Sequence, residues 1–305
     1  MAVSGGSSPT ALAVNPVTNK IYVADNGGTS VTVISGLNNT VTATVPVGSS
    51  PAAIAVNPIT NTIYVANSGS STVTVINGAN DMAVATVMVG TTPDAIAVNP
   101  LTNTVYVANA GGPSVSVING ATNTVTTTVG TGTNPVAVAV NPQTNMIYVA
   151  NKGSANVTVI TGATNAVAAT VGAGTNPVAV AVNSLNDEIY VANNGSNNVT
   201  AINGANNSPA TFADPNATGP IAIAVNSTTG VLYIANNTSS NVSALAVNQS
   251  TPTTITDPNA ANSVNVCGRV EGSLGLSEAV PTTDSTSGLG FIFWVTGVFV
   301  WPALD

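Results

Sequence analysis

The sequence contains no histidine, and charged residues make up only 5% of it. The absence of histidine excludes the His-containing catalytic triad and imidazole metal ligands, and it removes the commonest general base. The only basic residues are Lys20, Lys152 and Arg269, and the net charge is −8. Because a phosphate-binding surface needs clustered Lys and Arg, nucleic acid is not an expected partner.

Cysteine and long apolar runs are also scarce. Cys267 is the single cysteine, so no internal disulfide can form, and we interpret it as a small apolar residue rather than a nucleophile. No apolar run reaches the roughly 20 residues of a spanning helix, so no membrane span is expected. The first residues contain neither a charged stretch nor an apolar stretch, so no signal peptide is visible in this chain.

What the sequence does contain is one repeated unit. The segment PAAIAVNPITNTIYVAN at residues 51–67 recurs in the other repeats at steps of 42, 42, 42, 42 and 43 residues. Tandem units of this length are typical of folds in which each unit packs on its neighbours. The complete repeats are residues 9–48, 51–90, 93–130, 135–172, 177–213 and 220–256.

Each repeat is predicted to form four short strands. In the second repeat these are residues 53–56, 63–66, 73–76 and 84–87, which are rich in β-branched, aromatic or small apolar residues and are separated by turn residues. No apolar period of 3.6 residues is long enough for a helix. A four-stranded antiparallel unit of this length in tandem indicates an all-β fold, namely a β-propeller with four-stranded antiparallel blades.

The first strand of each repeat predicts how neighbouring blades pack. Ala53 and Ala55 place small side chains on one face of the strand, and Ile54 and Val56 place large ones on the other. Space is scarcest near the axis of a propeller, so a small face against a large face allows dense packing there. Each repeat also carries one tyrosine, which we interpret as inter-blade packing with a locally bonded hydroxyl.

Two turns in each repeat have a chemical signature. The first loop ends at Asn19, Asn61, Asn103, Asn145, Asp187 and Gly230 in the successive repeats. These residue types best tolerate a left-handed backbone, so we expect a positive φ at this position. Between strands three and four lie Gly36, Gly78, Gly120, Gly162 and Gly204, which suggest another tight hairpin. The sixth repeat has Val247 there, so we expect a different or looser turn.

The pattern weakens at both ends of the chain. Residues 257–260 repeat residues 214–217, and this register places Val264 and Val266 in the first strand of a seventh repeat. We therefore expect six regular blades over residues 1–256 and an irregular seventh blade or closing segment of the same domain over residues 257–305. Counting back 42 residues from the first repeat places Val3 in a fourth strand.

The repeats resemble a known family. The segments IYVAN at residues 63–67, TVING at 74–78 and TVMVG at 86–90 resemble the YVTN family of β-propeller repeats, and the resemblance covers residues 9–256. This family is similar to the propeller domain of archaeal surface-layer proteins, and similar repeats occur in secreted and periplasmic bacterial proteins. The resemblance implies a seven-bladed ring, a location at the cell surface, outside the cell or in the periplasm, and no shared catalytic motif.

The resemblance brings three other propeller functions into question. One relative is associated with single-stranded DNA, but the acidic balance and the lack of aromatic residues interleaved with basic ones argue against this function. Streptogramin-lyase propellers have a similar period but rely on histidine and a metal. Lactonase-like propellers stay open as an alternative, because they need mainly carboxylates and polar groups at the channel mouth.

The candidate binding residues are Asp94, Asp187 and Glu188. Asp94 replaces the Thr, Ala, Val or Ile of other repeats and lies near the predicted channel, although a solvated loop residue is the simpler interpretation. Asp187 and Glu188 are adjacent carboxylates, but Asp187 holds the turn position described above, which favours a structural role. No catalytic residue, cofactor or metal site is predicted, since a calcium site needs several converging oxygen ligands.

The sequence also contains Asn-X-Ser/Thr triplets, which are acceptor motifs for N-glycosylation. Examples begin at Asn38, Asn156, Asn198, Asn226, Asn241 and Asn248. In a chain so rich in Asn and Thr such triplets arise from composition, and glycosylation in a suitable host stays open as an alternative.

An apolar segment near the end of the chain is a candidate for assembly. Its large residues are Phe291, Phe293, Trp294, Phe299 and Trp301. We considered that it forms an irregular strand of blade seven, that it pairs with a neighbouring molecule and causes self-association, or that the residues after about 268 are aberrant.

Together these features favour a non-enzymatic β-propeller that is secreted or on the cell surface. It would act as a structural scaffold or interaction module for a protein or a cell-envelope polysaccharide. The alternative is a lactonase-like propeller enzyme, which requires Asp94, Asp187 and Glu188 to converge on one mouth of the channel.

Overall fold

The computed structural model describes residues 6–213, 217–247 and 264–267, and the regular structure in these residues consists of β-strands. The strands form six four-stranded sheets, each of which is one blade. The first three blades are β1 (Pro9–Asn15), β2 (Lys20–Asp25), β3 (Ser30–Ser35) and β4 (Val41–Pro46); β5 (Pro51–Asn57), β6 (Thr62–Asn67), β7 (Thr72–Asn77) and β8 (Met82–Met88); and β9 (Pro93–Asn99), β10 (Thr104–Asn109), β11 (Ser114–Asn119) and β12 (Thr124–Gly130).

The fourth and fifth blades follow the same antiparallel pattern, and the sixth differs in its last strand, which is parallel to its neighbour. The strands of these three blades are β13 (Pro135–Asn141), β14 (Met146–Asn151), β15 (Asn156–Thr161) and β16 (Ala166–Gly172); β17 (Pro177–Asn183), β18 (Glu188–Asn193), β19 (Asn198–Asn203) and β20 (Ser208–Phe212); and β21 (Pro220–Asn226), β22 (Val231–Asn236), β23 (Asn241–Ala246) and β24 (Val264–Cys267).

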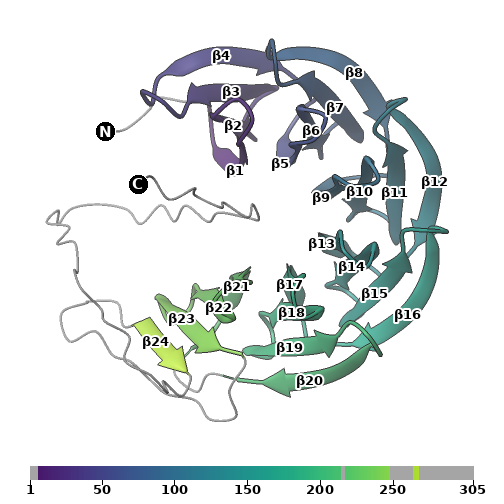
Figure 1. Ribbon diagram of the computed structural model, residues 1–305, viewed down its shortest axis with the longest axis vertical. Coiled ribbons are helices and arrows are strands. Elements are labelled where there is room, and N and C mark those ends of the chain that lie inside the picture. The colour runs from purple at the N-terminus through teal and green to yellow at the C-terminus, as the bar shows by residue number, and fades with distance from the viewer. Residues whose placement is uncertain (1–5, 214–216, 248–263, 268–305) are drawn as a thin grey trace, which may run out of the picture.

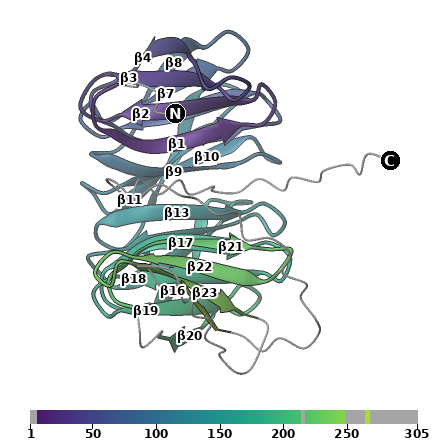
Figure 2. The same ribbon diagram turned by 90° about the vertical axis from the view of Figure 1, so that its left-hand side faces the viewer.

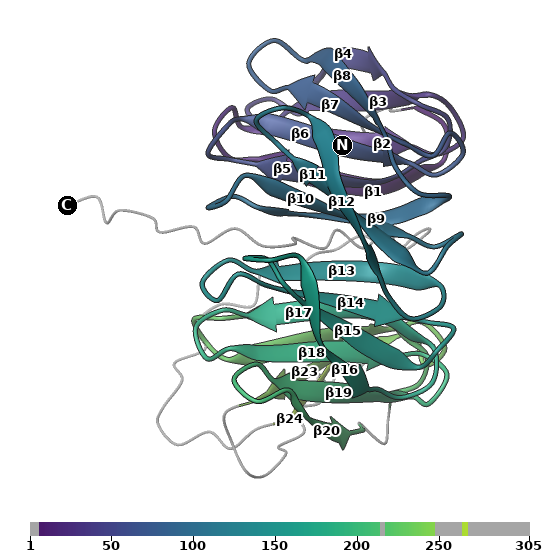
Figure 3. The same cartoon turned by 90° about the vertical axis from the view of Figure 1, so that its right-hand side faces the viewer.

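The six blades are arranged in an arc around a central axis (Figure 1). The first strand of each blade lies on the inside and the fourth on the outside, and the side views show the blades stacked one after another along the arc (Figures 2 and 3). Neighbouring first strands contact each other from β1 through β5, β9, β13 and β17 to β21. The prediction of a β-propeller with four-stranded blades is therefore confirmed.

The first loop of each blade has the predicted left-handed exit. In the second blade, Asn57 pairs with Thr62 across the loop, and the amide of Ile59 donates to Asn57 Oδ1 at 3.0 Å. The last loop residue has a φ of 53° at Asn61 and of 55° at Asp187. The Asn side chain thus holds the start of the turn, and a residue that tolerates positive φ ends it.

The glycine in the second hairpin has a different role from the one expected. The left-handed residue there is three positions later, for example Asn123 with a φ of 54°. Gly120 is required by close approach instead, because a Cβ there would stand 2.7 Å from Tyr64 Oη and 2.4 Å from Asn103 Oδ1. In the sixth blade the Val247 amide still donates to a carbonyl, that of Gly230, at 3.0 Å, and the rest of that turn lies outside the described residues.

The core is a series of interfaces between blades. At one of them, Tyr64 and Val75 of the second blade pack against Ile96, Val105 and Ile118 of the third. Ala53 and Ala55 pack against this interface with the small face of the first strand, as predicted. Each interface buries aliphatic surface on both sides, which stabilises the stack by the hydrophobic effect.

One prediction about the end of the chain was wrong. The sequence register had placed Val264 and Val266 in the first strand of a seventh blade. In the structure, residues 264–267 form β24, which runs parallel to β23 on the outer edge of the sixth blade. The outer edge of a strand offers backbone N–H and C=O groups that an extended segment can satisfy in either direction, so a repeat register does not decide the partner. Val3 and the remainder of residues 257–305 lie outside the described residues.

Candidate functional site

Successive first strands run in the same direction around the axis. At their starts, Thr10 Oγ1 donates to the carbonyl oxygen of Pro51 at 3.3 Å, and at their ends Asn15 Nδ2 donates to Asn61 Oδ1 at 2.6 Å. One face of the propeller therefore collects all the first loops. We call it the Asn-Pro face and define it by loop residues 15–19, 57–61, 99–103, 141–145, 183–187 and 226–230.

The three candidate acids lie on opposite faces of the propeller. Asp94 is the second residue of β9, which places it at the start of a first strand, whereas Asp187 and Glu188 follow the end of β17 on the Asn-Pro face. A first strand of seven residues spans about 20 Å. The structure thus keeps Asp187 and Glu188 together but separates both from Asp94.

Two opposing effects act on the pKa of Asp94. Its side chain is exposed, yet the surrounding strands displace part of its water and raise the pKa of the carboxyl group above its usual value. The positive charge of Lys152, on the next blade, partly opposes this shift in pKa. Lys152 is also exposed, so the two residues bring one negative and one positive charge to the face opposite the Asn-Pro face.

Asp187 belongs to a ladder of side-chain hydrogen bonds between blades. Asn57 Nδ2 donates to Asn103 Oδ1 at 2.8 Å, and the equivalent bond from Asn141 reaches Asp187 Oδ1 at 2.6 Å. The donor side chains of this ladder are fully buried. Because buried amides need partners, each rung fixes one blade to the next. Asp187 thus accepts a structural hydrogen bond, in agreement with the turn role expected for it.

Glu188 is bonded within its own strand. The hydroxyl of Tyr190 donates to Glu188 Oε2, and Asn186 Nδ2 donates to the same oxygen at 3.4 Å. Burial raises the pKa of Tyr190 well above its usual value. The hydrogen bond to Glu188 and the negative charge of Glu188 raise this pKa further. The carboxylate is therefore already engaged as an acceptor for this phenol.

A charged cluster joins the first two blades, and the sequence analysis missed it. Lys20 Nζ lies 2.6 Å from Asp81 Oδ2, and Tyr22 Oη donates to Asp81 Oδ1 at 2.7 Å. Burial raises the pKa of Tyr22, and the hydrogen bond to Asp81 and the negative charge of Asp81 raise this pKa further. The available signal was that Asp81 stands where the other repeats have Asn39, Asn123, Asn165 and Asn207.

Breaking this ion pair is expected to destabilise the protein more than removing both charges. Asp81→Asn and Lys20→Met should each lower the free energy of unfolding by about 1–2 kcal/mol, because each leaves a largely buried charge without its partner. The double variant should lose less stability than the sum of the two single variants, because neither charge is then left unpaired. Met should fit at residue 20, because Met146 holds the equivalent position in the fourth blade. Denaturant unfolding of the four proteins measures the coupling, and strictly additive losses would contradict it.

Five of the six tyrosines are inter-blade packing residues, as predicted, whereas Tyr233 is 40% exposed. The hydroxyls of the five differ. Tyr22 and Tyr190 bond to carboxylates. Within the described residues, the buried hydroxyls of Tyr64, Tyr106 and Tyr148 have no hydrogen-bond partner. The expected local bond is therefore present at Tyr190, whereas Tyr22 bonds to the next blade, and Tyr64, Tyr106 and Tyr148 contribute packing.

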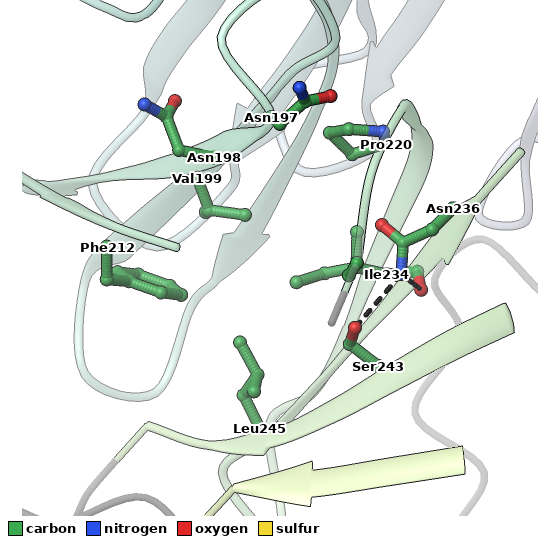
Figure 4. A pocket seen from close by; sticks show the side chains of 10 residues that line it. Asn197, Asn198, Val199, Phe212, Pro220, Ile234, Asn236, Ser243 and Leu245 are labelled. Carbon is green, nitrogen blue, oxygen red and sulfur yellow. Dashed lines mark hydrogen bonds between the residues drawn. The ribbon is translucent and has the colours of Figure 1, made fainter. Parts of the chain in front are cut away.

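A small pocket lies between the fifth and sixth blades (Figure 4). The side chains of Phe212, Ile234 and Leu245 face its interior, and Asn236 Nδ2 donates to Ser243 Oγ at 2.9 Å on one side. The lining is apolar on one side and amide- and hydroxyl-bearing on the other.

The Asn-Pro face carries exposed aliphatic side chains at one loop position. These are Val17 (58% exposed), Ile59 (65%), Leu101 (63%) and Leu185 (73%). The fourth and sixth blades have Gln143 and Thr228 at this position. The sequence analysis did not single these residues out, because their exposure depends on the loop projecting from the ring.

The described residues contain no group of three His, Cys, Asp or Glu side chains placed to hold a metal ion. In the same part of the chain there is no helix of sufficient length and apolarity to cross a membrane. The candidate assembly residues Phe291, Phe293, Trp294, Phe299 and Trp301 lie outside the described residues.

The blades and their faces define the class of protein, which is a β-propeller. No protein-family model matches the chain, and no curated protein sequence matches it either. Among solved structures, the chain is similar to hydrazine synthase of Kuenenia stuttgartiensis, with a TM-score of 0.54 and 18% sequence identity over 80% of this chain and 96% of that chain. At this identity the likeness shows the fold alone.

Proposed function

We propose that the protein is a non-enzymatic scaffold or interaction module, secreted or on the cell surface, that binds a protein or a cell-envelope polysaccharide through its Asn-Pro face. The observation that carries this proposal is the set of exposed aliphatic residues Val17, Ile59, Leu101 and Leu185, which recur at one loop position on one face. Exposed apolar groups that recur on one face of a soluble fold favour binding of a partner there.

The framework beneath these residues supports the same proposal. Each loop is held by an Asx hydrogen bond, such as Ile59 N to Asn57 Oδ1, and ladder bonds also join the first five loops from one blade to the next. A surface presented on rigid loops loses little conformational entropy when a partner binds. The loop acid Asp187 is engaged in the same framework.

The position of the acids is why we prefer a binding function to a lactonase-like enzyme. That alternative required Asp94, Asp187 and Glu188 at one mouth of the channel. Asp94 begins a first strand, whereas the other two follow the end of one, so the length of a strand lies between them.

The test is a variant that removes the aliphatic residues without disturbing the loops. Gln143 shows that the loop accepts a polar residue, so Val17, Ile59, Leu101 and Leu185 are all replaced by Gln. We expect unchanged thermal unfolding and at least a roughly tenfold weaker binding to isolated cell envelopes, because several apolar contacts are lost together. Separate protein and polysaccharide fractions of the envelope identify the class of partner.

A matched control removes exposed apolar residues elsewhere. Val41, Val84 and Val167 are exposed on outer strands and are replaced by Thr. This control should bind as the wild type does. Equal loss of binding in both variants, or no loss in the first, would refute the proposed surface.

A further inference from the structure

Two of the Asn-X-Ser/Thr triplets have a hydrogen bond from the hydroxyl of the triplet to its asparagine. The exposed triplet at Asn226 differs, because Asn226 Oδ1 accepts from the backbone amides of Thr228 at 3.1 Å and Thr229 at 3.2 Å. Asn38 and Asn206 are exposed in the hairpins between β3 and β4 and between β19 and β20. Asn38 Oδ1 accepts from the Thr40 amide at 3.2 Å and from Thr40 Oγ1 at 2.7 Å. Asn206 Oδ1 accepts from the Ser208 amide at 2.9 Å and from Ser208 Oγ at 2.6 Å. Each hairpin therefore presents the asparagine and the hydroxyl of its triplet side by side at the surface.

The side-chain nitrogen of both residues is available. Within the described residues, Nδ2 of Asn38 and Nδ2 of Asn206 make no hydrogen bond, since only the Oδ1 atoms are engaged. The bonds to Oδ1 fix the orientation of the amide, so Nδ2 is directed away from the turn that Oδ1 closes.

The triplets at Asn156 and Asn198 are tied into the blades. Asn156 Oδ1 accepts from Asn151 Nδ2 at 2.8 Å, and the hydroxyl-bearing Thr158 of that triplet is only 2% exposed. Asn198 Oδ1 accepts from Asn193 Nδ2 at 2.9 Å, and Thr200 is fully buried. An enzyme that must contact both the asparagine and the hydroxyl cannot reach these pairs in the folded protein.

We infer that Asn38 and Asn206 are acceptor sites for an N-linked glycan on the folded protein. The donor is an oligosaccharide carried on a lipid diphosphate, and a transferase catalyses the step. Nδ2 attacks the anomeric carbon of the first sugar, so that a C–N bond forms and the C–O bond to the diphosphate breaks. The lipid diphosphate leaves with the bonding electrons, and the amide proton passes to a base of the transferase. The inference rests on the proposed location outside the cytoplasm.

The position of these hairpins is compatible with the proposed binding surface. Both connect the third and fourth strands, which form the outer part of a blade (Figure 1). The loops that carry Ile59 and Leu101 connect the first and second strands, which form the inner part. Both hairpins adjoin the first loops, since Gly36 N donates to Asn19 O and Gly204 N to Asp187 O. Glycans at Asn38 and Asn206 would thus lie at the perimeter of the Asn-Pro face, and they would add solubility to a chain with few charges.

The test uses the purified, folded full chain in a cell-free reaction. A single-subunit oligosaccharyltransferase and its lipid-linked donor are added, and the sites are mapped by mass spectrometry. We expect glycans at Asn38 and Asn206 and none at Asn156 or Asn198. Thr40→Ala and Ser208→Ala should each abolish one glycan while circular dichroism and thermal unfolding stay unchanged.

The third blade allows a gain of modification. Thr122 occupies the position of Asn38, and it is followed by Asn123 and Thr124, so Thr122→Asn creates the same triplet in the same hairpin. Thr122→Gln is the control that creates no triplet. One additional glycan in the first variant and none in the second would support the inference.

Three results would overturn the inference. The first is that the folded wild type receives no glycan although the urea-unfolded chain is modified at Asn38 and Asn206. The second is transfer of a glycan to Asn156 or Asn198 in the folded protein. The third is that Thr122→Asn gains no additional glycan. Because the reaction is cell-free and involves no binding partner, a negative result would leave the proposed function standing. That function fails only through the aliphatic-residue variant.

Discussion

Raising the pH above about 10 is expected to unfold the protein cooperatively. Burial raises the pKa of Tyr22, Tyr64, Tyr106, Tyr148 and Tyr190 above the ordinary tyrosine value of 10.0, and for Tyr106 the pKa rises to about 12. These phenols lie between blades, where an ionised oxygen would have lost its water.

The sign of the pH effect follows from proton binding. The unfolded chain releases its tyrosine protons near pH 10.0, whereas folded Tyr106 keeps its proton up to about 12. The stability is therefore complete below pH 10 and is lost as the pH rises through the folded pKa. For a shift of about two units the loss is about 2.7 kcal/mol. Burial raises the pKa of Tyr22, Tyr64, Tyr148 and Tyr190 in the same direction, so each of these phenols adds to the loss of stability.

Parallel pH titrations of circular dichroism and of tyrosinate absorbance measure this effect. Both signals should change together in one steep transition. Tyr106→Phe removes one contributing phenol and should move the midpoint to higher pH, whereas the control Tyr233→Phe, at a side chain that is 40% exposed, should leave it in place. Gradual ionisation of the buried tyrosines near pH 10 with unchanged circular dichroism would contradict the prediction.

Replacing one of these tyrosines by alanine is expected to be the most damaging single substitution. Tyr106 is fully buried and packs with Val117 of its own blade against Ile147, Val149 and Ile160 of the fourth. Tyr106→Ala should lower the free energy of unfolding by about 3–5 kcal/mol, because it removes an aromatic side chain and leaves a cavity between two blades. Equilibrium unfolding in denaturant measures the loss.

Two variants test whether the loss of stability comes from the packing of the ring rather than from its hydroxyl, and whether it depends on burial. Tyr106→Phe should change the free energy of unfolding by less than about 1 kcal/mol, because the hydroxyl has no partner in the described part of the chain. Tyr233→Ala should cost clearly less than Tyr106→Ala, because Tyr233 is 40% exposed. If Tyr106→Phe cost as much as Tyr106→Ala, the hydroxyl rather than the packing would be the important group.

The repeat predicted the parts of the fold that depend on neighbouring residues in the chain. The strands, the small and large faces of the first strand, and the positive φ at Asn61 all follow from local side-chain size and backbone preference. The role of Gly120 did not follow, because it depends on Tyr64 of the preceding blade. The partner of Val264 did not follow either, because strand edges accept many segments.

The candidate site was predictable to a similar extent. The turn position of Asp187 suggested a structural role, and its carboxylate accepts a ladder bond from Asn141. The pair of Lys20 and Asp81 was missed because the two residues are 61 positions apart and meet only when two blades stack. The exposed row that includes Ile59 was missed because an aliphatic residue in a repeat suggests burial.

By itself, the sequence determined the first three strands of each blade and the conformation of the first loop, because each of these results from residues within one unit of about 42. Only the tertiary structure decided which polar groups meet between units and which face each one occupies. Asp94 is separated from Asp187 and Glu188 because first strands run in the same direction around the axis, so their starts and ends form opposite faces. That direction arises from the stacking of the blades.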